Sequence, residues 1–142
     1  MRRRRLKSSG PDKHVRLHRW VLHSDAYRSL SPAARALLVE LYDLYNGQNN
    51  GEVFLSHRDA AKRLGVGKNL AGKALRELKD RGFIRVQQLG SFHQKVRHAT
   101  EWVLTEFPHA GNLPTKDFMR WGPGVHHPGG SKIASGSSSH VP

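Results

Sequence analysis

The sequence predicts an α+β domain that is mainly helical, with a core of three helices and a small antiparallel sheet. Apolar residues recur at helical spacing in three separate stretches in the middle of the chain. Three short stretches, 52–55, 83–87 and 100–104, have the composition of strands. We therefore expect one folded domain, residues 14–107, with a tail on either side.

The chain is expected to begin with a disordered basic arm, residues 1–13, because this stretch has almost no apolar content. Residues 1–20 carry eight Lys or Arg and one Asp. Their net charge, 8 − 1 = +7, is more than half of the net charge of +13 of the whole chain. Beyond His14 apolar residues return, and Ser24 is expected to cap a short helical turn. Four residues of the arm are predicted to neutralise phosphates of a polyanion: Arg2, Arg3, Arg4 and Arg5. A tail that only aids solubility is the alternative.

Ser31-Pro32 is the clearest helix start, because a good N-cap precedes a proline at the first helical position. Asn46-Gly47 is expected to end this helix, since glycine suits a left-handed C-terminal cap.

Two shorter signals delimit the next two helices. Ser56 is expected to cap the second helix and Gly65 to end it. A third helix is expected at about 68–81, with Gly82 as its stop.

In each of the two strands that follow, alternate side chains are expected to point toward the core. Ile84 and Val86 are the inward residues expected of the first strand, and Trp102 and Leu104 those of the second. The polar, basic loop 90–98 between them is long for a hairpin without a function.

Past the last strand, residues 108–121 form an apolar segment that is expected to pack on the domain or on a partner. Phe118, Met119 and Trp121 are large and apolar, which is unusual in a solvated tail. Packing within the chain is favoured, and a contact with a second copy is the alternative. Residues 122–142, rich in Gly and Ser, are expected to be a disordered tail.

Composition narrows the functional classes. The 142 residues include 24 Lys+Arg, 11 Asp+Glu and no Cys, which excludes disulfides, cysteine zinc sites and thiol catalysis. No apolar run approaches the ~20 residues needed to span a bilayer, and no apolar segment of a secretory signal follows the basic start. We expect a cytoplasmic, nucleoid-associated protein with no membrane partner, whose first candidate partner is a polyanion.

The order of helix, strand, helix, short glycine turn, helix, strand, basic loop and strand resembles a winged helix-turn-helix domain. Two segments carry the resemblance, SHRDAAKRLGV at 56–66 and ALRELKDRGFI at 74–84. The second is similar to the helix end and strand entry of MarR-like and GntR-like bacterial regulators. The whole also resembles small winged-helix proteins of plasmids and prophages, some of them regulators and some active near replication.

In such a domain the third helix is the element that fits the major groove of duplex DNA. Lysine can donate to guanine or phosphate, and asparagine can pair with adenine. We expect Gly72 to let the backbone approach a groove wall. Ion pairs of Lys73 with Glu77 and of Arg76 with Asp80 are the alternative interpretation. The residues predicted to contact DNA from this helix are Lys68, Asn69, Gly72, Lys73 and Arg76.

Two further sets of contacts are predicted. The N-terminus of the second helix offers Ser56, His57 and Arg58. The resemblance makes loop 90–98 the wing, which commonly meets phosphates or the minor groove. Its candidate residues are His93, Gln94, Lys95, Arg97 and His98.

The third helix departs from related domains at two positions. Gly67 stands at its N-cap, where a hydroxyl residue is usual. Leu70 stands where a polar residue is common, and it is expected to turn toward Ala74 and the core. A contact with a thymine methyl group is the alternative for Leu70.

The sequence indicates neither a metal centre nor an enzyme. Its ten His have no Asp, Glu or Cys at a spacing that completes a site, so no metal or cofactor is expected. The glycines at 122 and 124 follow no strand and open no helix, unlike a dinucleotide-binding loop. No small-molecule ligand is evident.

Sequence-specific binding of double-stranded DNA by a transcriptional regulator of a bacterium or mobile element is the leading hypothesis. A replication initiator or accessory protein is one alternative, and an RNA-binding or ribosome-associated winged helix is another. A module that only binds proteins is disfavoured by the basic third helix. The sequence leaves open the operator, the direction of regulation and whether the protein forms a homodimer.

Overall fold

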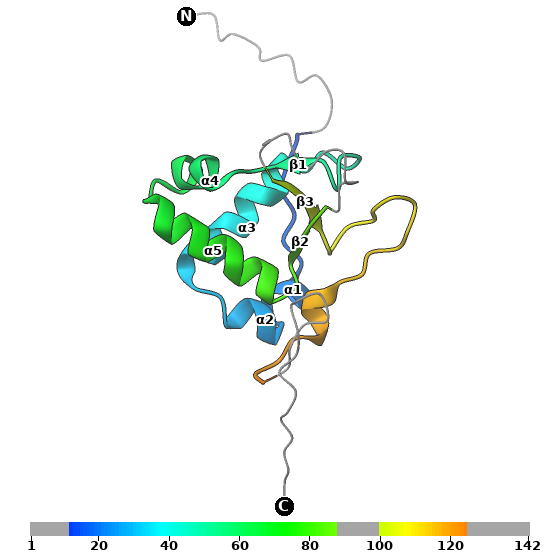
Figure 1. Cartoon of the computed structure of the whole chain (residues 1–142). Helices are drawn as coiled ribbons and strands as arrows, with labels where there is room; N and C mark the ends of the chain where they lie inside the picture. Colours follow the sequence, from blue (N-terminus) through cyan, green and yellow to red (C-terminus); the bar gives the residue numbers. More distant parts are fainter. Residues whose placement is uncertain (1–11, 88–99, 125–142) are drawn as a thin grey trace, which may run out of the picture.

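The computed structural model describes residues 12–87 and 100–124. Helices α3–α5 lie on one side of a small sheet, and the short helices gather near the C-terminal end of α5 (Figure 1). The predicted α+β, mainly helical fold is confirmed. Its helical elements are α1 (Arg19–Leu22), α2 (Asp25–Arg28), α3 (Pro32–Leu44), α4 (His57–Leu64), α5 (Lys68–Asp80) and the 3-10 helix η2 (Asp117–Arg120). Its strands are β1 (Val53–Phe54), β2 (Ile84–Val86) and β3 (Glu101–Leu104).

Hydroxyl caps begin three of the helices. Ser24, Ser31 and Ser56 each accept a hydrogen bond from a backbone N–H in the first turn of α2, α3 and α4. Pro32 occupies the first position of α3, as predicted. These starts follow local sequence, which is why they could be predicted.

The end of α3 differs from the prediction. The helix stops at Leu44 and its C-cap, Tyr45, is extended, so Asn46-Gly47 is not the cap. Gly47 does adopt a positive φ of 98°, but inside the loop. The amide of Asn49 donates instead to the Leu44 carbonyl at 3.0 Å, because a side chain from the loop can satisfy the end of a helix without a left-handed residue.

The sheet is antiparallel with the order β1-β3-β2. Trp102 of the central strand pairs with Val53 on one side and Val86 on the other. Trp102 and Leu104 face the core, as predicted, and the Trp102 indole donates to the Leu55 carbonyl at 3.0 Å. The sheet thereby closes one side of the helical core.

The burial expected of Val86 as an inward residue is not found, whereas Ile84 is buried. Val86 is 42% exposed. It is the last residue of a three-residue edge strand, which has a neighbouring strand on one side alone. The alternation of a strand sets the direction in which a side chain points. Whether that side chain is buried depends on whether other elements of the domain pack over it.

Stacked aromatic rings attach both flanking segments to the core. Phe118 of η2 is fully buried and stacks on Phe83 with ring centroids 4.6 Å apart. On its other side it stacks on Trp20, at 5.9 Å, and Trp20 stacks on His18. Large apolar groups at 118 and 20 thus find partners within this chain.

The neighbours of Phe118 differ from it in burial. Met119 is largely exposed. Trp121 is half-buried beneath the Arg81 guanidinium, which lies 5.1 Å from its ring centroid. Phe118 is therefore the main anchor of this segment.

A buried polar pair joins α3 to the segment that follows β3. The Tyr42 hydroxyl donates to the carboxylate of Glu106, and both residues are buried. Burial raises the pKa of Glu106, while the hydrogen bond from Tyr42 and the charges of His18 and Lys116 act in the opposite direction. Burial also raises the pKa of Tyr42 well above its usual value, so the phenol keeps its proton.

Phe118→Ala should lower the free energy of unfolding by about 3–5 kcal/mol, because it removes a fully buried ring and leaves a cavity. Trp121→Ala should cost clearly less, because its ring is partly solvated. Urea unfolding at two protein concentrations measures both losses. A loss that grows on dilution would instead indicate that this segment stabilises a dimer.

Glu106→Gln should remove a pH dependence of stability. Because the folded-state pKa of Glu106 is raised, its stabilisation is complete below the unfolded pKa of about 4.3 and is lost as pH rises through the folded value. The free energy of unfolding of wild type should therefore fall relative to the Gln variant across this window. Urea titrations at several pH values, with the exposed Glu52→Gln as control, measure it; a constant difference would contradict the expectation.

Candidate nucleic-acid interface

Helices α4 and α5 meet through small side chains. Ala60 and Ala61 of α4 and Ala71 and Ala74 of α5 are all buried. The turn between the helices begins at Gly65, which has a φ of 68° and caps α4 in the left-handed conformation. Val66 follows and packs against the core. The result is a tight helix–turn–helix whose second helix presents one face to solvent.

Gly72 is used for packing within this unit, which corrects its predicted role. It is buried, and a Cβ atom at this position would lie 3.1 Å from Nδ1 of His57. The missing side chain therefore accommodates the His57 ring, not a groove wall. The contact places the first turn of α4 beside the middle of α5.

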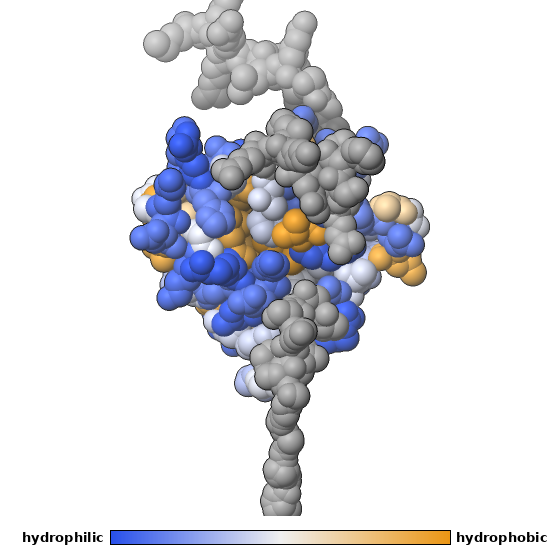
Figure 2. Space-filling model, in the orientation of Figure 1, coloured by the Kyte–Doolittle hydropathy of each residue, from blue (hydrophilic) through white to orange (hydrophobic). Residues whose placement is uncertain are grey.

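The outer face of α5 is polar and basic. Asn69, Lys73 and Arg76 are spaced at intervals of four and three, so they form one stripe along the helix, and all three are exposed. Lys68 is exposed at its start. Hydrophilic residues cover much of the side of the molecule formed by α4 and α5 (Figure 2).

The alternative of ion pairs on this face is wrong. None of the ion pairs among the described residues includes Lys73 or Arg76. The Glu77 carboxylate is engaged elsewhere: it accepts hydrogen bonds from the backbone N–H of Ser31 at 3.0 Å and from its hydroxyl at 2.6 Å. Glu77 also lies 4.0 Å from Arg81. The cations on the stripe consequently keep their charge available.

The first turn of α4 adds hydrogen-bond donors next to this stripe. His57 and Arg58 are exposed. Ser56 is occupied by capping, because its hydroxyl accepts from the Asp59 N–H at 3.0 Å and donates to the Asp59 carboxylate at 2.8 Å. That second bond lowers the pKa of Asp59.

A family model described as a helix-turn-helix domain matches residues 27–84, which run from α2 to the first residue of β2. Residues 27–84 are a helix-turn-helix domain. The antiparallel strands β2 and β3 after α5 make it a winged helix-turn-helix, and a domain of this kind binds DNA. Comparisons with curated proteins and with solved structures found no match.

The helix-turn-helix domain exposes one large apolar residue on α5, and the prediction for it is wrong. Leu70 does not turn toward the core but is 44% exposed. Four steps along a helix rotate the side chain by only about 40°, so Leu70 lies at the border of the apolar face, one turn before the buried Ala74, and is nevertheless exposed. Gly67, the N-cap of α5, offers no side-chain hydrogen bond there.

Two sets of predicted DNA contacts lie outside the described residues. One is the wing set: His93, Gln94, Lys95, Arg97 and His98. The other is the arm set: Arg2, Arg3, Arg4 and Arg5. The helical residues predicted to contact DNA are described, and the contact between His57 and Gly72 brings the α4 and α5 sets together.

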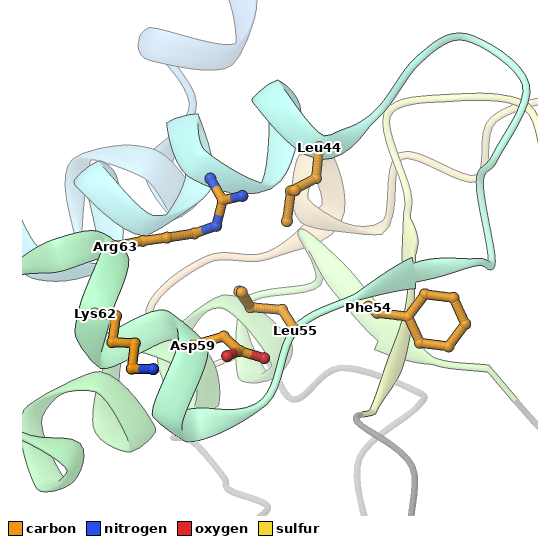
Figure 3. A pocket seen from close by; sticks show the side chains of 6 residues that line it. All are labelled: Leu44, Phe54, Leu55, Asp59, Lys62 and Arg63. Carbon is orange, nitrogen blue, oxygen red and sulfur yellow. The ribbon is translucent and has the colours of Figure 1, made fainter.

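A hollow of about 380 Å³ lies between α3, β1 and α4 (Figure 3). Two of its charged groups already have partners: Arg63 pairs with Glu40 at 3.0 Å, and Asp59 bonds Ser56. This hollow therefore adds little evidence for a ligand. Its lining residues are Leu44, Phe54, Leu55, Asp59, Lys62 and Arg63.

Residues 12–87 and 100–124 contain no group of three or more potential metal ligands. None of the helices in these ranges is long and apolar enough to cross a membrane.

Sequence reasoning missed the positioning role of Glu77. No local signal marks it, because its partner Ser31 is 46 residues away. The exposed position of Leu70 could not be found from helical rotation alone, because Leu70 lies one turn before Ala74, which is buried.

Glu77→Ala should lower the free energy of unfolding by about 1–3 kcal/mol, because two donors of Ser31 lose their acceptor at the start of α3. Asp80→Ala, which removes an exposed carboxylate from the same helix, is the matched control and should cost little. Urea unfolding compares the two. Equal losses would mean that the bonds between Glu77 and Ser31 contribute nothing specific.

Proposed function

We propose that the protein is a transcriptional regulator of a bacterium or mobile element that binds double-stranded DNA sequence-specifically. In this proposal α5 enters the major groove, and wing 90–98 contacts the DNA backbone or the minor groove. The observation that carries it is the exposed stripe of Asn69, Lys73 and Arg76, whose two cations take part in no ion pair of the described residues.

The stripe has the size and chemistry that major-groove reading requires. A helix of 13 residues is about 20 Å long, and the major groove admits an α-helix. Lysine and arginine donate to guanine, and asparagine pairs with adenine in a two-point contact. Because neither cation has a carboxylate partner in ranges 12–87 and 100–124, DNA binding would not have to break an ion pair there first.

The first turn of α4 would fix the helix-turn-helix on the DNA backbone. The ring of His57 sits against Gly72, so His57 and its neighbour Arg58 lie beside the reading helix. Contacts from such donors to phosphate set the register of a protein on duplex DNA without reading sequence. Ser56 supports this turn as its cap.

The arm and the wing would add affinity that does not depend on sequence. Four consecutive arginines, 2–5, neutralise phosphates and release counterions, and cations of the wing would do the same. Such contacts raise the rate of encounter with any duplex. Selection among duplexes is then left to α5.

Selection of bound sequences from a random duplex library with the full chain tests the proposal. A consensus supports sequence-specific binding; a palindromic one indicates a dimer, and direct repeats favour the replication alternative. Binding without any consensus would contradict the proposal and would favour an architectural or RNA-binding role.

Lys73→Ala and Arg76→Ala should each weaken binding to the selected duplex by ~1–3 kcal/mol if they read bases. Both side chains are exposed, so the free energy of unfolding should change little. Fluorescence anisotropy with selected and scrambled duplexes measures binding, and exposed Lys79→Ala on the same helix is the control. An equal loss on both duplexes would show that Lys73 and Arg76 contact phosphates only.

A further inference from the structure

Leu70 is an apolar group on the otherwise polar, solvent-facing side of α5. It is 44% exposed and lies in the first turn of a helix that begins at Lys68. It is absent from the apolar residues that form or adjoin the described core. A single exposed leucine is ordinary on a protein surface. Its position in the first turn of α5 is what calls for an explanation.

The place of Leu70 is where a reading helix meets base edges. In helix-turn-helix proteins, residues near the N-terminus of the recognition helix contact the bases. Leu70 is three residues before Lys73, so the two side chains are neighbours on the helix surface. A duplex close enough for Lys73 to reach a base therefore also comes close to Leu70.

The charges around Leu70 favour DNA over a protein as its partner. Lys68 and Lys73 are exposed near it and have no ion-pair partner among the described residues. An apolar protein surface placed on Leu70 would bury these charges without compensation, which is costly. A polyanion compensates them, and the apolar group that the edges of base pairs offer in the major groove is the C5 methyl of thymine.

We propose that Leu70 contacts the C5 methyl group of a thymine and thereby selects T at one position of the binding site. This inference rests on the proposed function, because it requires that α5 enter the major groove. It adds an apolar element to a stripe whose other members act through hydrogen bonds and charge.

Deoxyuridine tests the contact, because it differs from thymidine by this methyl group alone. Each T of the selected duplex is replaced in turn by deoxyuridine, and the Kd of the full chain is measured by anisotropy. We expect about a fourfold loss of affinity at one position, the change associated with one methyl-sized apolar group. Leu70→Ala should show no loss at that position, whereas the conservative Leu70→Met should retain it.

Two measurements keep the test independent of folding and assembly. Circular dichroism and urea unfolding should show that Leu70→Ala folds like wild type, as expected for an exposed side chain. Val39→Ala, which truncates an exposed apolar residue of α3, is the matched control and should keep the full deoxyuridine effect. A change of sedimentation coefficient with Leu70→Ala, but not with Val39→Ala, would overturn the inference in favour of a protein contact.

Failure of the inference differs from failure of the proposed function. If a consensus is selected but deoxyuridine weakens wild type and Leu70→Ala equally, or weakens neither, the methyl contact is overturned and sequence-specific binding stands. If no consensus is selected, the proposed function fails and the methyl contact fails with it.

Discussion

The close approach of α4 to α5 is the constraint on which the rest of the domain depends. It requires Ala or Gly on both sides of the contact, since larger side chains would separate the helices, and it requires a turn short enough to hold them. Gly65 makes that turn in a left-handed conformation, and Gly72 leaves room for His57. Once α4 is seated, the buried and exposed faces of α5 are set, and with them the stripe of Asn69, Lys73 and Arg76.

A single carboxylate links this unit to the remaining helix. Glu77 accepts hydrogen bonds from both donors of Ser31, so the C-terminal part of α5 is joined to the start of α3. The same bonds withdraw Glu77 from Lys73, four residues earlier on the helix. Glu77 could pair with Lys73 on its own helix or accept hydrogen bonds from Ser31 of the neighbouring helix. Because it binds Ser31, it joins two helices and leaves the charge of Lys73 available.

Local signals in the sequence were enough for the helix starts, the glycine turn and the order of the elements, because a hydroxyl cap or a left-handed glycine acts on its own neighbours. Predictions failed where burial depended on distant segments. Val86, the last residue of an edge strand, is exposed, and Leu70 is exposed although it lies one turn before the buried Ala74. The partner of Glu77 and the ring that fills the space at Gly72 come from other helices, so spacing along one helix could not identify them.

Stacked aromatic rings connect the residue before β2 with both flanking segments of the domain. Phe83 directly precedes β2, after the turn at Gly82 that ends the α5 segment, so it marks where α5 passes into the sheet. Phe118 stacks on Phe83, and Trp20 stacks on Phe118. Trp20 lies in α1, the first helix of the described residues. The end of the α5 segment, the start of β2 and the helices α1 and η2 therefore share one aromatic anchor, which joins both flanking segments to the helix-turn-helix domain.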